Sequence, residues 1–393
     1  MTGPTITESM STKDPFMASS ITVTDHGLEI HLPGFDRSAS ISWHWLRDHD
    51  ESEAGQDPVT KQRRVDTFSL GEVHPGTVCL DDGKATVTWA DGAVAMCSRH
   101  LLESVAAECL ATDWSRRPDV EPSLPVDAVL WPDPSIGPDE IELDAFLDPV
   151  SDEALTRGVD LLSRYGYLVL RGAVLDRDRA GAFARRLGYV RHTIFGGMWD
   201  LAPDLTDHAD TAYTTVYLAP HTDGTYSHDA PGLQFFLCLQ AAPQGGESLL
   251  VDGFAIAAQL AATDPETFVT LASVPVPGRY IEPGVHLRAE RPVFRSTARG
   301  VLDQVSFNNY DRAPFLLPPE LERRFNRAYR RFAELAADPA RRVAVGLTAG
   351  DILIFDNWRT LHGRNAFVGP RHYVGAYLNH EDLESKRRVL FGS

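Results

Sequence analysis

Apolar and polar residues alternate along the first quarter of the chain, a pattern that predicts short β-strands. In the segments ITVTDHGLEIHLP (21–33) and KATVTWADGAVAMCS (84–98), apolar and polar residues alternate on both sides of a turn that contains Asp and Gly. This pattern is typical of hairpins. A short helix is predicted at 98–111, where the apolar spacing becomes helical. We therefore expect a small β-rich N-terminal domain over 21–115, preceded by a flexible tail at 1–20.

The next stretch, from Thr112 to Glu140, contains six prolines and little periodicity. Proline disfavours helical backbone at the residue before it, so this composition predicts an extended linker or a strap across a surface. We place the linker at 116–140 and a second, larger domain at 141–393.

The larger domain begins with helical patterns and continues with many short strands. Residues 151–166 have helical spacing, with Ser151 as the expected N-cap, and residues 176–188 form a second amphipathic pattern. A further helical insert is expected at 318–338. The expected strands are YLVLRG, TAYTTVYL, GLQFFLCLQ, GESLLVDG, DILIFDN and HYVGAYLN. Together these patterns predict a mainly β fold with helical support, namely a double-sheet jelly roll, or double-stranded β-helix.

Composition narrows the class of function. The chain has 393 residues and a formal net charge of −18, which argues against nucleic acid as a partner and mildly favours cationic small molecules. No apolar run approaches the roughly 18 residues of a membrane-spanning helix. The N-terminus shows no signal-peptide pattern. The four cysteines show no C-x-x-C spacing, so we expect neither a disulfide framework nor a thiolate metal site. These features predict a cytoplasmic protein that binds no membrane.

Candidate metal ligands come from the pattern His-x-Asp, which occurs at His208/Asp210, His221/Asp223 and His380/Asp382. The second pair directly follows an alternating strand pattern, and in extended backbone residues i and i+2 point to the same face. His362 follows the apolar strand DILIF and could return on a neighbouring strand. These three side chains would form a 2-His-1-carboxylate triad, which leaves open positions on Fe(II). The alternative is that they are ordinary hydrogen-bonded residues.

A 2-oxo acid that chelates iron needs a cation for its distant carboxylate, and Arg supplies a planar bidentate donor. Arg371 lies nine residues after His362 and opens a predicted strand, while Arg364 is a competing candidate. Ser248, in GGESLLVDGF, could add a hydroxyl donor, although a turn or solvent-facing role is an alternative.

Several long motifs, taken in order, resemble the γ-butyrobetaine and trimethyllysine dioxygenases, a family of Fe(II)- and 2-oxoglutarate-dependent oxygenases of carnitine synthesis. The resemblance covers most of residues 160–390. It rests on AYTTVYLAPHTDGTYSHDAPGLQFFLCL, GGESLLVDGF, SFNNYDRA and FDNWRTLHGRNAFVGPRHYVGAYL. The segments GGMWD, SFNNYDRA and RHYVGAYLN are closer to trimethyllysine dioxygenase. The resemblance implies that His221, Asp223 and His362 bind iron and that Arg371 binds 2-oxoglutarate.

The resemblance also implies a substrate pocket for a quaternary ammonium group. Such a group donates no hydrogen bond and is held by cation–π contact with aromatic rings. The family's aromatic positions fall on Phe195, Trp199, Tyr213 and Tyr377, and Asp210 can add a carboxylate. Core packing is the alternative role for each ring. Asn308 and Asn309 resemble residues that bind the substrate's polar end, and Arg191, Arg312 and Arg364 are candidates for its anionic group.

The N-terminal domain also resembles that of the family at WHWLRDHD and DPVTKQRRVDTFSL, but with one departure. After WLRDH the family usually has a cysteine cluster that holds zinc, whereas this chain reads DESEAGQDP. Because zinc needs Cys and His at close spacing, we expect no structural zinc.

The resemblance implies hydroxylation of Nε-trimethyllysine to 3-hydroxy-Nε-trimethyllysine, with O₂ consumed and a homodimer as the expected assembly. Two alternatives use the same chemistry on γ-butyrobetaine or on a trimethylammonium phosphonate. A non-catalytic betaine-binding jelly roll and a zinc hydrolase are further alternatives, and both leave Arg371 without a role. The sequence does not show which quaternary ammonium compound is the substrate.

Overall fold

The structure is a computed structural model that describes residues 19–81, 83–112, 114, 123–125, 127–172, 176–202 and 214–392, together with the backbone of 5–8. The chain folds into two compact units. The N-terminal unit holds residues 1–117, 276–288 and 309–330, and the larger unit holds 118–275, 289–308 and 331–393. The sequence prediction gave each domain one continuous stretch of chain. In the structure, residues 276–288 and 309–330 also belong to the N-terminal unit.

The N-terminal unit contains two small sheets and two early helices. One sheet is the antiparallel β2 (Ser20–Thr24), β3 (Gly27–His31) and β4 (Ala39–Ser42), and the other is β1 (Thr5–Glu8), β5 (Pro75–Leu80), β6 (Lys84–Trp89) and β7 (Val94–Ser98). The hydroxyls of Ser42 and Ser98 cap the helices α1 (Trp43–Asp48) and α2 (Arg99–Ala111). Alternating residues of both sheets and the apolar faces of both helices enclose one core, which includes Ile30, Trp45 and Val87.

A seven-stranded sheet forms the centre of the larger unit. Its order is β10 (Val190–Arg191), β24 (His372–Leu378), β13 (Leu233–Gln240), β21 (Ile352–Asp356), β9 (Tyr167–Arg171) and β8 (Ile141–Glu142), with β11 (Met198–Leu201) also paired to β24. Most of these strands match the predicted apolar runs. The strand predicted at TAYTTVYL differs, because residues 214–217 are not extended in a ladder and the strand begins only at Leu218.

The second sheet has the order β12 (Leu218–His221), β22 (Thr360–Arg364), β15 (Ser248–Asp252) and β20 (Val343–Val345). Side chains alternate along the large sheet, as a period of two requires. Leu353 and Phe355 of β21 pack with Leu250 and Val345 of the small sheet. Ile352 and Ile354 belong to a different core, on the opposite face. The larger unit therefore has the two packed sheets of a jelly roll, which agrees with the predicted fold class for this unit.

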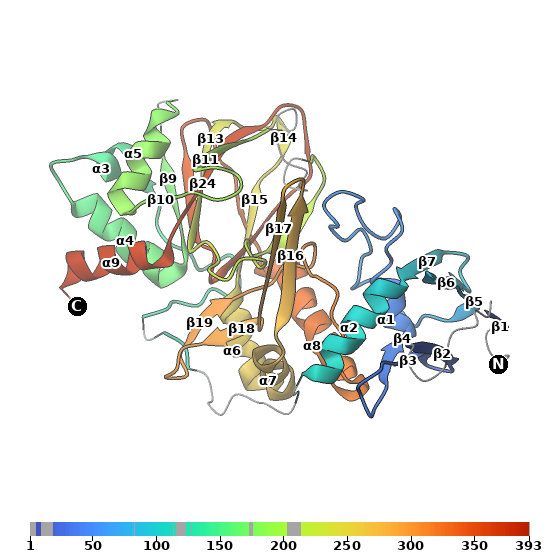
Figure 1. Ribbon diagram of the computed structural model, residues 1–393. Coiled ribbons are helices and arrows are strands. Elements are labelled where there is room, and N and C mark those ends of the chain that lie inside the picture. The colour runs from blue at the N-terminus through green and yellow to red at the C-terminus, as the bar shows by residue number, and fades with distance from the viewer. Residues whose placement is uncertain are drawn as a thin grey trace. The chain divides into compact units, whose positions relative to one another are not determined.

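Helices cover the outer face of the large sheet (Figure 1). They are α3 (Leu143–Leu147), α4 (Glu153–Tyr165), α5 (Asp178–Leu187) and α9 (His380–Phe391). The prediction that Ser151 caps α4 is wrong, because the helix begins at Glu153 with Asp152 as its N-cap. The Ser151 hydroxyl instead accepts a hydrogen bond from the Glu153 amide at 3.3 Å, a local turn that precedes the helix.

The remaining elements are short or connect the sheets. They are α6 (Gly253–Thr263), α7 (Pro265–Ser273), β14 (Gln244–Gly245) with β23 (Phe367–Val368), β16 (Val276–Glu282) with β17 (Val285–Arg291), β18 (Phe294–Ser296) with β19 (Leu302–Val305), α8 (Pro319–Ala337) and the 3₁₀ turn Pro339–Arg341.

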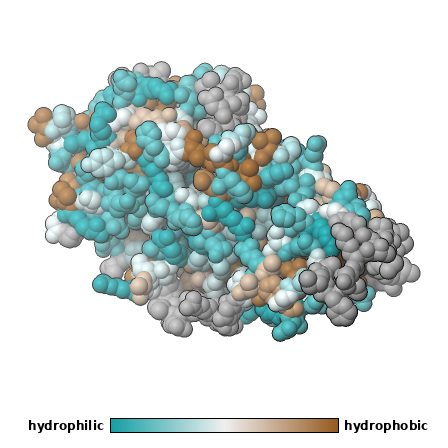
Figure 2. Space-filling model, viewed as in Figure 1, coloured by the Kyte–Doolittle hydropathy of each residue, from teal (hydrophilic) through white to brown (hydrophobic). Residues whose placement is uncertain are grey.

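Hydrophilic residues cover most of the coloured surface in this view, and the most prominent of several apolar groups lies near its upper middle (Figure 2). Across the described residues, the helices are too short or too polar to cross a bilayer.

The proline-rich segment packs onto the larger unit through Trp131, whose side chain is fully buried. Its backbone amide donates to Asp252 Oδ2 at 3.1 Å. Asp252 in turn receives the Arg359 guanidinium at 2.8 and 3.1 Å, and Arg359 also donates to the backbone carbonyls of Val129 and Arg164. This buried ion pair therefore ties the segment to α4 and to the small sheet.

We predict that Arg359→Met destabilises the protein by about 3–5 kcal/mol, because the Asp252 carboxylate would stay buried without its counter-charge. Urea denaturation followed by fluorescence measures the change. Arg157→Met is the matched control, since its ion pair with Asp139 is exposed and is worth about 0–1 kcal/mol. Equal stability of the two variants would contradict the role assigned to Arg359.

Candidate active site

Two strands distant in sequence bring the candidate metal ligands together. β12 runs antiparallel to β22, and the register places His221 directly opposite His362. Side chains of directly opposed residues point to the same face of a sheet, and here the two imidazole centroids lie 4.4 Å apart. Asp223 follows β12 by two residues, and its carboxylate lies 3.3 Å from His221 Nε2 and 3.6 Å from His362 Nε2.

The ligand atoms of these three residues all lie within 4.8 Å of one another, and no other such group of His, Cys, Asp or Glu occurs in the described part of the chain. The other His-x-Asp patterns do not form a second centre there. His380 lies near Asp356 and Glu384 at the start of α9, while Asp382 accepts the Asn379 amide in a capping box. His208 and Asp210 lie outside the described residues.

Hydrogen bonds fix the orientation of the ligands. His221 Nδ1 lies 2.8 Å from the Ala219 carbonyl, so Nδ1 carries the hydrogen and Nε2 is left as a metal ligand. The Tyr377 hydroxyl donates to Asp223 Oδ2 at 2.6 Å. Phe355 packs against the His362 ring with the centroids 4.7 Å apart.

Asn357 holds the backbone of Asp223 from both sides. Its side-chain oxygen accepts the Asp223 amide at 2.8 Å, and its side-chain nitrogen donates to the carbonyls of Asp223 at 3.1 Å and Pro231 at 2.8 Å. Asn357 is 1% exposed. The sequence prediction missed this residue, although it lies inside the motif FDNW that precedes His362.

The electrostatics favour the protonation states that bind metal. Burial raises the pKa of Asp223, but the neighbouring His362 and His221 hold it well below its usual value. Burial, together with His221, lowers the pKa of His362, although Asp223 acts in the opposite direction. An ionised carboxylate beside an imidazole with a lowered pKa suits the donor set of a 2-His-1-carboxylate iron site.

Two arginines of the larger unit were predicted as candidates for an anionic ligand. Arg371 is 6% exposed, and its guanidinium carbon lies 3.6 Å from the centroid of the Tyr373 ring. Burial lowers its pKa, and among the described residues it forms no ion pair with Asp or Glu. Arg364 instead donates to the carbonyls of Thr214 at 2.5 Å and Val216 at 3.2 Å.

Burial, together with Arg371, lowers the pKa of Arg364 to about 10. Ser248 is buried and lies opposite Arg364 in the pairing of β15 with β22, so both side chains face the interior between the sheets. Arg371 is thus a buried cation near this interior, with no carboxylate partner among the described residues.

Three of the predicted aromatic positions lie together. Trp199 is 4.5 Å from Tyr377 and 6.0 Å from Phe195, measured between ring centroids. Gly375, opposite Trp199 on β24, makes this packing possible, because a Cβ there would lie 2.8 Å from the indole. Tyr213 and Asp210 lie outside the described residues.

The polar candidates are divided between the two units. Asn308 is buried in the larger unit, whereas Asn309 belongs to the N-terminal unit, where it donates to Thr67 Oγ1 and accepts from Arg312 Nε. Arg191 pairs with Asp229 at 2.7 Å, and Arg312 pairs with Asp48 at 2.5 Å. These two arginines therefore already have carboxylate partners.

We predict that Asn357→Ala weakens Fe(II) binding by roughly 10–100-fold, the cost of losing a group that orients a metal ligand. Titration of the metal-free protein with Fe(II) under anaerobic conditions measures the affinity. Asn365→Ala is the control, because that side chain donates to Glu247 and contacts none of the three ligands. Unchanged iron affinity in a folded Asn357→Ala variant would contradict the prediction.

Several known proteins are similar in sequence to this chain over most of its length. Residues 129–377 match the family model described as "Taurine catabolism dioxygenase TauD, TfdA family". The chain is 32% identical over 382 residues to the mitochondrial trimethyllysine dioxygenase of Rattus norvegicus, covering 95% of this chain and 88% of that one. It is 31% identical over 361 residues to the γ-butyrobetaine dioxygenase of a Pseudomonas strain, covering 88% and 89%.

Among solved structures, a taurine dioxygenase from Burkholderia xenovorans aligns over 61% of this chain and 84% of that one, with 20% identity and a TM-score of 0.44. The family-model match spans more than half of the chain, and the sequence relatives are matched over most of their length. The chain therefore belongs to the TauD/TfdA dioxygenase family, together with the trimethyllysine and γ-butyrobetaine dioxygenases.

Proposed function

We propose that this protein is an Fe(II)- and 2-oxoglutarate-dependent dioxygenase that hydroxylates a small molecule bearing a trimethylammonium group. The observation that carries the proposal is the cluster of His221, Asp223 and His362 in a chain whose relatives are trimethyllysine and γ-butyrobetaine dioxygenases. We further propose Nε-trimethyllysine as the substrate and its 3-hydroxy derivative as the product, because several of the matching relatives are named trimethyllysine dioxygenase.

The triad would hold Fe(II), which with 2-oxoglutarate and O₂ supplies the oxidation of a C–H bond, with succinate and carbon dioxide as co-products. The residues of the chain position the reactants and exclude water. Arg371 would pair with the distant carboxylate of 2-oxoglutarate, since its buried guanidinium has no acidic partner among the described residues. Ser248 would add a hydroxyl donor from the neighbouring strand.

The cluster of Phe195, Trp199 and Tyr377 would hold the trimethylammonium group by cation–π attraction, with Tyr213 and Asp210 as further proposed members. Tyr377 also donates to the iron ligand Asp223, so one residue would touch both the cation pocket and the metal site. The distance between pocket and metal then selects which carbon is oxidised. Asn308 is the candidate for the polar end of the substrate.

We predict succinate formation that depends on Nε-trimethyllysine, with a product heavier by one oxygen. The assay uses iron-loaded protein with 2-oxoglutarate and O₂, and γ-butyrobetaine and a trimethylammonium phosphonate serve as parallel substrates. His362→Ala is the control for background turnover. If only one of the two parallel compounds is turned over, the substrate assignment is wrong and the proposed type of reaction still holds. Tight betaine binding without succinate would instead indicate a non-catalytic binding protein.

A second prediction concerns the cation pocket. Trp199→Leu should raise the KM for the cationic substrate by roughly 3–30-fold, since a cation–π contact is worth about 0.5–2 kcal/mol. An inhibitor with a neutral tert-butyl group in place of trimethylammonium should lose less affinity, and the KM for 2-oxoglutarate should stay unchanged. Equal losses for the charged and neutral compounds would mean that Trp199 acts by packing alone.

Location and assembly stay predictions. A cytoplasmic location is the expectation from the sequence, while the name of the rat relative places that protein in mitochondria. A homodimer is proposed, and light scattering of the purified protein would measure its mass.

A further inference from the structure

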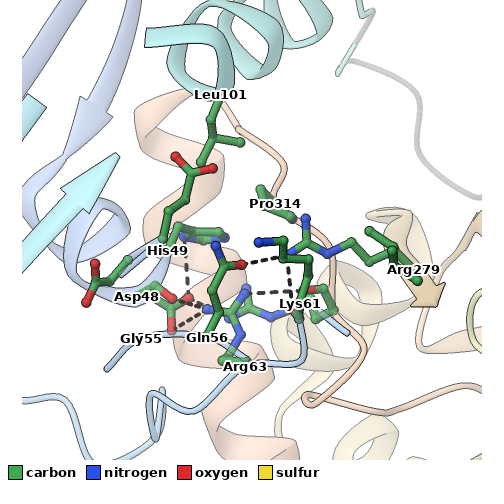
Figure 3. Close-up of a pocket in the computed structure, with 13 residues that line it drawn as sticks. Asp48, His49, Gly55, Gln56, Lys61, Arg63, Leu101, Arg279 and Pro314 are labelled. Atoms are coloured by element: carbon green, nitrogen blue, oxygen red, sulfur yellow. Dashed lines mark hydrogen bonds and ion pairs between the residues drawn. The ribbon is translucent and has the colours of Figure 1, made fainter. Parts of the chain in front are cut away.

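The N-terminal unit contains a pocket that the proposed reaction does not use. Its volume is about 170 Å³ (Figure 3). Its walls come from the end of α1, the following loop, β16 and the segment around Arg312, and every lining residue belongs to this one unit. The triad belongs to the larger unit, and none of its residues lines this pocket.

A buried ion cluster forms the floor of the pocket. The Asp48 carboxylate receives Arg63 at 3.0 Å and Arg312 at 2.5 Å, and all three side chains are less than a tenth exposed. Although burial raises the pKa of Asp48, the two guanidinium groups hold it below its usual value. One carboxylate thus faces two cations, which leaves an excess positive charge at a buried position.

Two further cations line the same pocket. Arg279 Nη2 donates to Gln56 Oε1 and to the Lys61 carbonyl, both at 3.1 Å, and the first bond is visible in Figure 3. These acceptors are neutral, and among the described residues Arg279 forms no ion pair with a carboxylate. Lys61 stands in the left-handed backbone region, with φ 59°.

The other acidic side chains of the pocket are directed toward backbone donors. Asp50 Oδ1 accepts the amides of Ser52 at 2.9 Å and Met96 at 2.8 Å, and Glu51 accepts the amide of Ser98. Glu51 still lies close enough to raise the pKa of Arg279. Four cations nevertheless line the pocket against three carboxylates, in a chain whose net charge is −18.

His49 adds a buried atom that lacks a partner. Its ring stacks on Trp45 at 4.0 Å, and its Nδ1 lies 2.9 Å from the Trp45 carbonyl, so Nδ1 carries the hydrogen. Burial and Arg63 lower its pKa well below the usual value, so the ring is neutral at pH 7. Its Nε2 is then an acceptor, and it finds no donor among the described residues.

We propose that this pocket binds a compact oxyanion that also carries a hydroxyl group, such as hydrogen phosphate or a hydroxycarboxylate. The anionic oxygens would receive Arg279 and Lys61, and the hydroxyl would donate to His49 Nε2. A bare cation is disfavoured, because Asp48 already serves two guanidinium groups. The inference does not depend on the proposed reaction.

The test titrates inorganic phosphate into the full-length, metal-free protein by isothermal calorimetry, with sulfate and malate in parallel. Arg279→Gln and Lys61→Asn should each weaken phosphate binding roughly ten- to a hundred-fold, the loss of a charge-assisted hydrogen bond. Asn tolerates the left-handed backbone at position 61, so that variant removes charge without strain. Arg157→Gln should bind as the parent does, because its half-exposed side chain pairs with Asp139 in the larger unit.

Sulfate has the size and charge of phosphate but no hydroxyl at neutral pH, so it should bind more weakly, and His49→Phe should remove that difference. If malate binds more tightly than phosphate, the ligand of this pocket is a hydroxycarboxylate and not a phosphate. Arg371→Met separates this site from anion binding beside the iron centre. Phosphate binding lost only in Arg371→Met, unchanged in both pocket variants, or absent in the parent would overturn the proposal.

Discussion

The antiparallel pairing of β12 with β22 determines whether this chain has a metal site at all. A shift of one residue in that pairing would turn His362 to the other face of the sheet and leave His221 with no opposing ligand. Close strand approach fixes the register, because Gly363 lies where a Cβ would come within 2.5 Å of the Leu218 carbonyl. The Thr360 hydroxyl donates to the Gly166 carbonyl at 2.9 Å and anchors the start of β22.

The position of the third candidate ligand, Asp223, depends on side-chain hydrogen bonds and not on strand pairing. Asp223 lies beyond the end of β12, so no ladder holds its backbone, and the Asn357 amide group supplies the missing hydrogen bonds. Asn357 stands on the turn between β21 and β22, and that turn leads to His362. One short connection therefore sets the positions of two ligands. Tyr377 on β24 then links Asp223 to the aromatic cluster, so one hydrogen bond joins the proposed cation pocket to the candidate metal site.

Sequence patterns predicted the parts of this arrangement that local chemistry dictates. The buried strands at 233–240, 352–356 and 372–378 stand out as apolar runs, and the triad follows from motifs at strand ends. Asn357 and Gly375 were missed because their roles exist only after distant segments meet. The same reason explains the N-terminal unit, which takes in residues 276–288 and 309–330 through packing that no local pattern encodes.

Buried arginines in the larger unit show how the same side chain can serve structure or ligand binding. Arg359 uses its donors on Asp252 and on two carbonyls, so its charge is balanced within the fold. Arg371 is also buried and meets aromatic rings, but no carboxylate among the described residues. Burying a cation without its counter-ion costs free energy, and this cost lowers its pKa. An anionic ligand at the proposed 2-oxoglutarate position would offset that cost, whereas at Arg359 the fold itself supplies the counter-charge.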